Sequence, residues 1–388
     1  MELTLRILFY TSGFIIVWAM VGYPLSLKLI GRIYKDRQLK KNYLHQPTVT
    51  VMVVAHNEEK VIFEKLNNIL ELDYSQDKIQ FLVSSDNSTD NTNDIVRQFI
   101  KEHDDKDIRL FEVQARKGKT NAQNEAQKRV TTEYLVMTDA NSIMDKNAIK
   151  ELMAAFTSTD IAYVTGRLSI INQGVSDVSS SEASYWDSDL ATRELEGRIQ
   201  TITAGNGAIY ACRTSDYHDF NSIECHDSAM PPFFALQGKR AICNHDAVAY
   251  EKAGEVIEDE FGRKVRMSRI ILDQILPDIS ILNIFKYKWF SYFYIGHRTC
   301  RYLLWISHLV VFVANAFLIT QSSFYAATFA AQVLFYLLGI IRAVTKTNNK
   351  QLTMIYYYCV TIAAQWVGVY NILTGHAKPF WEKAESTR

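Results

Sequence analysis

This 388-residue sequence contains few cysteines and carries no formal net charge. Its five cysteines are Cys212, Cys225, Cys243, Cys300 and Cys359, and they show no paired spacing of the kind that metal sites use. We therefore expect reduced thiols that pack as small core side chains. The formal net charge is zero, so the overall charge gives no indication of a nucleic-acid partner.

Charge is also absent from three long runs. Residues 7–27, 302–341 and 351–377 contain no Asp, Glu, Lys or Arg. Because about 20 apolar residues make a helix long enough to cross a bilayer, the first and third runs each fit one crossing. The second run has a polar centre at residues 320–323, which predicts two crossings joined by a tight turn. The sequence thus predicts an integral protein of the plasma membrane.

Basic residues beside these runs predict the orientation. The first run has no small-residue cleavage site after it, which argues against a signal peptide. Its basic flank consists of Lys28, Arg32, Lys35, Arg37, Lys40 and Lys41, and the loop between the last two runs carries Arg342, Lys346 and Lys350. Since such flanks stay in the cytoplasm, the middle of the chain is expected there. With four crossings, the N-terminus and the tail after Ala377 are then expected outside.

The middle of the chain alternates between strand and helix patterns. Strands are predicted at 48–55, 79–86, 108–113 and 133–139, and helices at 58–72, 91–100 and 120–128. This alternation predicts an α/β domain with a mainly parallel sheet and helices on both faces. Ligands of such sheets bind beyond the carboxyl ends of the strands, so polar residues at those ends are candidate site residues.

Polar residues follow all four predicted strands, at 56–59, 86–90, 116–119 and 139–141. Each group alone could be an ordinary helix-capping loop. Together they combine acidic and basic residues, which fits an anionic ligand bound with a metal. Residues 117–120 resemble the end of a P-loop but lack its upstream glycine, and no Gly-x-Gly-x-x-Gly occurs in this part of the chain. Dinucleotide-dependent dehydrogenases and P-loop NTPases are therefore disfavoured.

Several segments carry a resemblance to a known family. In order, they are VMVVAHNEEKVI, VSSDNSTDNT, RKGKTNAQNEA, VMTDAN, SYWDSDLATRELE with TAGNGAIYACR, HDSAMPPFFALQGKRAICNHDAVAYE, and EDEFGRKVRMSR. Over about residues 48–269 the chain resembles a membrane-embedded family 2 glycosyltransferase of the cellulose synthase and hyaluronan synthase type. This resemblance implies a GT-A fold, a UDP-sugar donor, and a glycan or lipid-linked acceptor.

The resemblance also implies a role for particular residues. The donor-binding residues would be His56, Glu58, Asp86, Lys119, Arg263 and Arg266. On the acceptor side would lie Gly205, Asn206, Gly207 and Met267. Asp139 would hold Mg²⁺ or Mn²⁺ with Asn141 beside it, and Asp227 would be the general base. One carboxylate suffices for such a cation because phosphate oxygens and waters complete its coordination.

The chain departs from the family pattern at several positions. Asn141 stands where the family often has a second Asp, so somewhat weaker metal affinity is expected. Met267 replaces a Trp and Arg263 replaces a Gln, which leaves processivity open. The protonation state of His226 is also open, and Asp227 could instead be the N-cap of the helix that follows it.

These expectations divide the chain into parts. The predicted parts are a transmembrane helix (1–30), a cytoplasmic GT-A domain (31–262), interfacial amphipathic helices (263–300), three transmembrane helices (301–377) and a tail (378–388). Three helices after the domain are few for a private glycan conduit, so a homo-oligomer is allowed.

We therefore expect an inverting, metal-dependent glycosyltransferase that extends a cell-surface polysaccharide, with coupled export left open. The alternatives are transfer of a single sugar to a lipid carrier, or a membrane-anchored subunit that binds a nucleotide sugar without catalysis.

Overall fold

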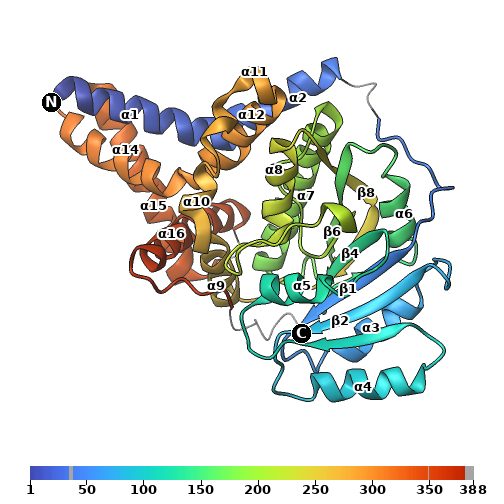
Figure 1. The fold of residues 1–388 in the computed structure, drawn as a ribbon. Coiled ribbons are helices and arrows are strands. Elements are labelled where there is room, and N and C mark those ends of the chain that lie inside the picture. The colour runs from blue at the N-terminus through green and yellow to red at the C-terminus, as the bar shows by residue number, and fades with distance from the viewer. Residues whose placement is uncertain (35–37, 348, 381–388) are drawn as a thin grey trace.

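The chain folds into a sheet domain (residues 49–251) and a group of helices on one side of it (Figure 1). The computed structural model describes residues 1–34, 38–347 and 349–380. Lys35 and Arg37 of the basic flank and residues 381–388 of the tail lie outside the described residues.

One eight-stranded sheet, in the order β3-β2-β1-β4-β7-β6-β8-β5, forms the centre of the sheet domain. The strands are β1 Val49–Ala55, β2 Ile79–Ser85, β3 Ile108–Glu112, β4 Tyr134–Asp139, β5 Ile143–Met144, β6 Ile161–Ile170, β7 Ile209–Arg213 and β8 Arg240–Glu251. β1 pairs in parallel with β2 and β4, β2 with β3, and β6 with β8, whereas β7 is antiparallel to both its neighbours. The predicted α/β fold with a mainly parallel sheet is confirmed.

The register of the central strands gathers their polar ends at one edge. Every residue of β1 is buried, as its β-branched and apolar sequence predicts. Val54 of β1 pairs with Asp139 of β4, and Ala55 pairs with Ser85 of β2. His56, Asp86 and Asp139 therefore leave the sheet at the same edge, one strand apart.

Helices cover both faces of the sheet (Figure 1). They are α3 Ile62–Leu70, α4 Thr92–Glu102, α5 Lys119–Gln127, α6 Ala148–Ala154, α7 Asp177–Ile199 and α8 His226–Leu236. α3 begins four residues later than the predicted 58–72 helix. The reason is a loop contact: the backbone N–H of Glu58 donates to Thr92 Oγ1 (2.7 Å) and that of Glu59 to Asp90 Oδ2 (3.2 Å).

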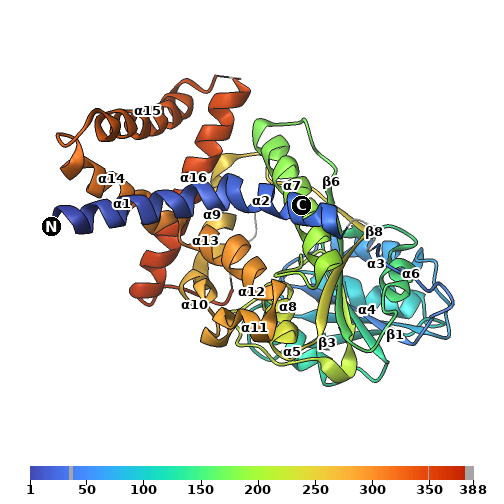
Figure 2. The ribbon, with the colours of Figure 1, turned by 90° about the horizontal axis from the view of Figure 1, so that it is seen from above.

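The remaining helices lie on one side of the sheet domain (Figure 2). They are α1 Glu2–Val17, α2 Tyr23–Ile33, α9 Ile257–Met267, α10 Ile271–Ile275, α11 Ile284–Tyr287, α12 Trp289–Phe293, α13 Cys300–Tyr302, α14 Leu304–Leu318, α15 Ser323–Thr345 and α16 Lys350–Leu373. Within the described residues, Glu2–Ile33, Ser323–Thr345 and Lys350–Leu373 are long and apolar enough to cross a membrane. The pair Trp289–Tyr302 and Leu304–Leu318, bent by 62°, is a fourth candidate if it counts as one span.

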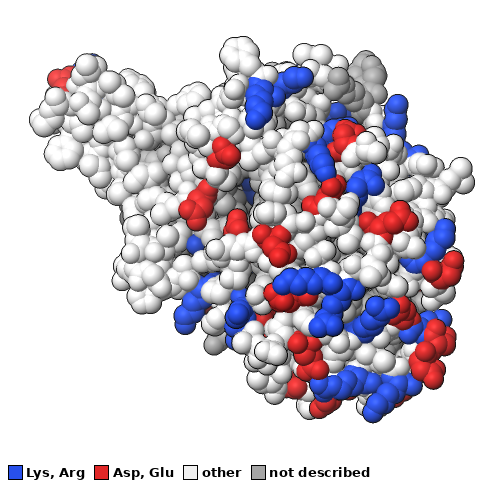
Figure 3. All heavy atoms as spheres, viewed as in Figure 1, with Lys and Arg blue, Asp and Glu red and all other residues white. Residues whose placement is uncertain are grey.

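Charged side chains are concentrated on the sheet domain and are rare on the helical part. Lys, Arg, Asp and Glu cover the sheet domain in a mixed pattern, whereas the helical part at the left of the view is almost free of them (Figure 3). Exposed apolar side chains on α1 and α15 include Phe14, Val17, Leu334 and Ile340. An uncharged surface of this kind suits contact with lipid.

α16 runs beside the sheet domain instead of away from it. In Figure 2 it passes across α1, while α14 lies alongside α1. The Tyr357 hydroxyl of α16 lies within hydrogen-bond distance of both Glu260 (3.0 Å) and Glu182 of α7. Near the other end of the helix, a side chain at Gly368 would collide with Ser268. This helix therefore follows the domain over most of its length.

The tail returns to the sheet domain as a result. The carbonyl oxygen of Pro379 accepts a hydrogen bond from Arg269 (3.2 Å), and the ring of Phe380 lies 4.7 Å from the guanidinium carbon of Arg116. A tail in contact with this domain lies on the same side of a bilayer as the domain. These contacts favour a tail on the same side as the domain, whereas hydropathy predicts the opposite side, so the side on which the tail lies stays a prediction. The position of the N-terminus stays a prediction.

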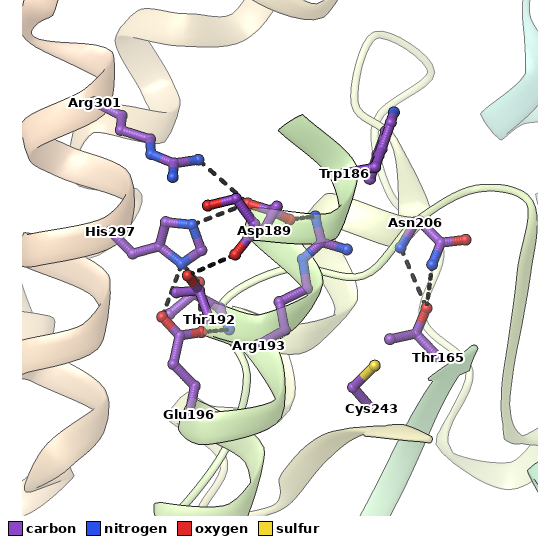
Figure 4. A network of polar contacts seen from close by, with 12 residues as sticks. Thr165, Trp186, Asp189, Thr192, Arg193, Glu196, Asn206, Cys243, His297 and Arg301 are labelled. Atoms are coloured by element: carbon purple, nitrogen blue, oxygen red, sulfur yellow. Dashed lines mark hydrogen bonds and ion pairs between the residues drawn. The ribbon is translucent and has the colours of Figure 1, made fainter. Parts of the chain in front are cut away.

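A buried polar network joins the sheet domain to the helices (Figure 4). Asp189 of α7 accepts from His297 (3.1 Å) and from Arg301 (3.2 Å). Glu196 lies about two turns further along α7. It contacts His297 Nδ1 (2.7 Å) and accepts from the hydroxyl of Tyr23 in α2 (2.6 Å). Removing one member of a buried ion pair typically costs about 3–5 kcal/mol, so this network fixes the domain against the helices.

Terminal tags test this arrangement. A tag fused after Arg388 should be digested by protease from the same side as the sheet domain, because Pro379 and Phe380 contact that domain. Protease protection in inverted and right-side-out vesicles measures this, with a cleavage site engineered into the sheet domain as the control. A C-terminal tag that is protected while the sheet domain is cut would contradict the described tail.

Candidate active site

A cavity of about 1020 Å³ opens at the edge of the sheet where the central strands end. It is lined by His56, Glu58, Asp86, Lys119, Asp139, Asn141, Asn206, Gly207, Asp227, Arg263, Arg266 and Met267. Every predicted site residue except Gly205 thus lines one hollow. Gly205 lies behind it, where its N–H donates to the backbone oxygen of Asp227 (2.7 Å) and its α-carbon packs against Tyr163.

Asp86 shapes one end of the cavity. Its side chain is buried, and its two carboxylate oxygens accept the backbone N–H groups of Lys117 (3.1 Å) and Gly118 (2.9 Å). Gly118 has a φ of 96°, a conformation that favours glycine, and it is the residue before α5. His56 Nδ1 lies 2.7 Å from the backbone oxygen of Asp86. Asp86 therefore holds the turn that aims Lys119 into the cavity.

Charged groups converge in front of Gly207. A β-carbon on Gly207 would lie 3.1 Å from Lys119 Nζ, 3.3 Å from Asp139 Oδ2 and 4.0 Å from the carboxyl carbon of Asp227. The Lys119 ammonium forms an ion pair with Asp139. Burial lowers the pKa of Lys119, but the carboxylates of Asp139 and Asp227 outweigh it, so this pKa is raised. Lys119 therefore stays protonated at neutral pH.

Asp227 stands in the first turn of α8. The N-cap of this helix is Cys225, so Asp227 is not the capping residue, and its carboxyl group faces the cavity. Burial raises the pKa of Asp227; Asp139 raises it further, while Lys119 opposes the shift. A carboxylate with a raised pKa, at the wall of a cavity, has the properties of a general base.

His226 is structural in this arrangement. Its Nδ1 lies 2.7 Å from Gln123 Oε1 and its Nε2 lies 2.8 Å from the hydroxyl of Tyr217. Burial, assisted by Lys119, lowers the pKa of His226 to about 3. The imidazole is therefore neutral at physiological pH, which answers the question that the sequence left open. A neutral ring adds no positive charge beside Asp227.

The residues at Asp139 fit a hard divalent cation. Across the described residues, no group of three or more His, Cys, Asp and Glu gathers as a metal site. The cavity rim provides the Asp139 carboxylate, the Asn141 amide and open space in front of Gly207. The positive charge now beside Asp139 is the Lys119 ammonium. Mg²⁺ and Mn²⁺ accept oxygen ligands, and Mg²⁺ keeps several waters, so this donor set suits a cation that is shared with phosphate groups.

The two predicted arginines differ in their partners. Arg263 directs its guanidinium to the carboxylates of Glu182 and Glu260, with 2.8 Å from Nε to Glu260. Burial, followed by the charges of Arg263 and Arg269, lowers the pKa of Arg266 to about 10, so it remains a cation. Arg266 is therefore the better candidate for the diphosphate, and Arg263 belongs to a carboxylate cluster at the wall of the cavity.

Lys65 was not among the predicted site residues. It lies fully buried beneath the end of β4, where its ammonium donates to Thr138 Oγ1 (2.9 Å) and to the carbonyl oxygen of Ser142. These two contacts flank Asp139 and Asn141, so Lys65 supports the loop from below. Burial lowers its pKa to about 7. A lysine within a helical pattern gives no sequence signal for such a contact.

The lining residues that were not predicted include Glu182, Trp186 and Phe380. Trp186 belongs to a segment that carries the family resemblance, and Glu182 lies two residues before that segment, yet no pattern there distinguishes a cavity residue from a helix-surface residue. Phe380 reaches the cavity from the tail. Its position depends on the course of α16, which no local pattern indicates.

Comparison with known proteins agrees with this site. Residues 50–215 match the family described as glycosyl transferase family 2. A probable glycosyltransferase, YdaM of Bacillus subtilis, is 32% identical over 165 residues, which cover 40% of this chain and 39% of that protein. The resemblance predicted from the motifs is confirmed over this domain.

Other relatives are named synthases. The poly-β-1,6-N-acetyl-D-glucosamine synthase of Staphylococcus epidermidis is 27% identical over 47% of this chain and 48% of that protein. Its namesake from Staphylococcus aureus is 23% identical over 76% and 74%, respectively. The chain thus spans less than half the length of the first two relatives, and about three quarters of the third.

A solved structure shares the fold. The mannosyltransferase PcManGT of Pyrobaculum calidifontis, in complex with GDP-Man and Mn²⁺, superposes with a TM-score of 0.69 at 20% identity. The superposition covers 94% of this chain and 99% of that one. It confirms the fold, including the general placement of helices beside the sheet domain.

The pH dependence of transfer tests the environment of Asp227. A general base must be deprotonated, so the rate should fall as pH drops through the raised pKa of Asp227, above the value of about 3.9 for an ordinary Asp. The measurement is kcat/KM against pH at a fixed metal concentration. His226→Gln is the matched control: because His226 is already neutral, this variant should keep the acid limb in place. If the acid limb moves in His226→Gln, the group that titrates is His226 and not Asp227, and the prediction is contradicted.

Proposed function

We propose that this protein is an inverting, divalent-metal-dependent glycosyltransferase that takes its sugar from a nucleoside diphosphate at the cytoplasmic face of the membrane. One observation carries the proposal: Lys119, Asp139 and Asp227 converge in front of Gly207. A leaving diphosphate needs cations, and an attacking hydroxyl needs a base. Lys119 and a cation at Asp139 would supply the positive charge, and Asp227 would supply the base, all within one cavity.

The nucleotide end of the cavity supports the donor class. His56, Asp86 and Lys119 follow three strands at one edge of the sheet, where nucleotides bind in open α/β sheets. Arg266 and Lys119 supply permanent positive charge for the diphosphate. A divalent cation held at Asp139, with Asn141 beside it, would neutralise the diphosphate charge that develops as the sugar leaves.

Asp227 carries out the proton step in this proposal. The acceptor hydroxyl attacks the anomeric carbon from the side opposite the diphosphate, and its proton passes to the Asp227 carboxylate. A bond forms between the acceptor oxygen and the anomeric carbon, while the bond to the diphosphate oxygen breaks and its electron pair leaves with the nucleotide. A single displacement of this kind inverts the anomeric configuration. Asp227, buried beside Lys119, is held ready for it.

The relatives suggest the first sugar to test. Two of them are named for the synthesis of poly-N-acetyl-D-glucosamine, so UDP-N-acetylglucosamine is our first candidate donor. The proposed product is a cell-surface polysaccharide, and α1, α14 and α15 are the proposed membrane crossings. α16 is proposed to lie at the membrane surface, because it follows the sheet domain and the tail returns to that domain.

A donor panel tests the proposed function. Purified protein with Mn²⁺ or Mg²⁺ should release UDP from at least one UDP-sugar, and chelation should abolish the release. Product analysis then separates a polymer from a single sugar on a lipid carrier. A folded protein that binds UDP but turns over no UDP- or GDP-sugar would instead be a nucleotide-sugar-binding subunit.

Two variants separate donor binding from transfer. Asp227→Asn should keep UDP affinity and lose transfer by about 10²–10⁴-fold, since it removes only the base. Asp139→Ala should weaken metal-dependent UDP binding and transfer together. Calorimetric titration with UDP and initial rates measure the two effects. An active Asp227→Asn enzyme would exclude Asp227 as the base.

A further inference from the structure

Trp186 is an aromatic side chain of α7 that lines the cavity. Figure 4 shows it on the side of α7 nearer to Asn206, while Arg301 and His297 lie on the other side of this helix. Its ring is partly exposed, and it is one of the few large apolar surfaces among the charged residues of the hollow. Trp186 and residues of α9 line the same cavity as His56 and Asp86 at the strand ends.

The orientation of the ring is fixed by a hydrogen bond. The indole N–H donates to Glu182 Oε1 at 2.7 Å. Glu182 is buried and is itself held by Arg263, which donates to the same oxygen, and by the hydroxyl of Tyr357. Trp186 therefore cannot rotate freely without breaking a contact of a buried carboxylate. Its polar N–H is already satisfied, and the Arg193 guanidinium carbon lies over one face of the ring, 5.6 Å from its centroid, so the surface left for a ligand is the opposite apolar face.

Arg263 links Met267 to the carboxylate that holds Trp186. Arg263 donates from one nitrogen to Glu182 and from another to Met267 Sδ (3.5 Å). The Arg263 guanidinium thus lies between Glu182, which accepts from the indole N–H, and Met267, which is half-exposed. Met267 is flexible, whereas the Trp186 ring is planar and fixed, so the rigid platform in this part of the cavity is Trp186.

We propose that Trp186 binds a sugar ring of the acceptor by stacking against its C–H face, and so positions the acceptor hydroxyl toward Asp227. This inference rests on the proposed function. Pyranose rings present apolar C–H faces with hydroxyls at the rim, which matches a flat indole surrounded by carboxylates and guanidinium groups. The donor's nucleotide and diphosphate are accounted for by the strand ends and by Lys119 and Arg266, which leaves the α7 wall for the acceptor.

Oligosaccharide binding tests this role without turnover. The probes are short oligosaccharides of N-acetylglucosamine, glucose and mannose, titrated into the full chain with UDP and Mn²⁺ present. Wild type should bind at least one series. Trp186→Ala should weaken that binding about tenfold, Trp186→Phe should restore much of it, and UDP affinity should stay within about twofold in both.

Trp305→Ala is the matched control. Trp305 packs against Trp366 among the membrane-side helices, 4.8 Å between ring centroids, and its removal should leave oligosaccharide affinity unchanged. Three results would overturn the inference: wild type that binds none of the probes, Trp186→Ala that binds them as tightly as wild type, or Trp186→Ala that loses UDP affinity in parallel. If no donor is turned over, the proposed function fails while the binding result still stands, so the two failures are distinguishable.

Discussion

Two carboxylates and one ammonium share the small space in front of Gly207, and the rest of the site is arranged around this group. The carboxylates of Asp139 and Asp227 would repel each other in a buried position, and Lys119 compensates part of that charge. Only glycine leaves the space open, because a side chain at 207 would fill it. The same arrangement supports the proposed diphosphate site, because a diphosphate with its cation would bring negative charge to Lys119 and positive charge to Asp139.

Support for this group comes from two directions. Below it, buried Lys65 contacts both sides of the Asp139 loop, and Asp86 fixes the turn before Lys119. On the membrane side, the Asp189, Glu196 and His297 network fixes α7 against the helices that follow the domain. Glu196 also accepts from the backbone N–H and the hydroxyl of Thr203 (3.3 and 3.2 Å), just before the loop that holds Gly207. The catalytic loop is thus linked to the membrane-side helices through one buried carboxylate.

Local pattern was enough to predict the four strands β1 to β4 and their polar edge, but not β5 to β8. The apolar, β-branched run of β1 is buried in the interior of the parallel sheet. Its pairing with β4 places Asp139 beside Val54. The sequence gives no signal for contacts that depend on long-range packing. Arg263 has a motif position but binds Glu182, 81 residues away. Phe380 reaches the cavity only because α16 turns along the domain, and hydropathy cannot give that direction.

Locating the metal relative to the diphosphate tests the central claim most directly. Anomalous scattering from a Mn²⁺ complex with UDP would show the ion as a single peak. The account predicts this peak at coordination distance from the Asp139 carboxylate, about 2–2.6 Å, with the diphosphate between it and Arg266. UDP bound with its diphosphate away from Asp139, and with no manganese peak in front of Gly207, would contradict it.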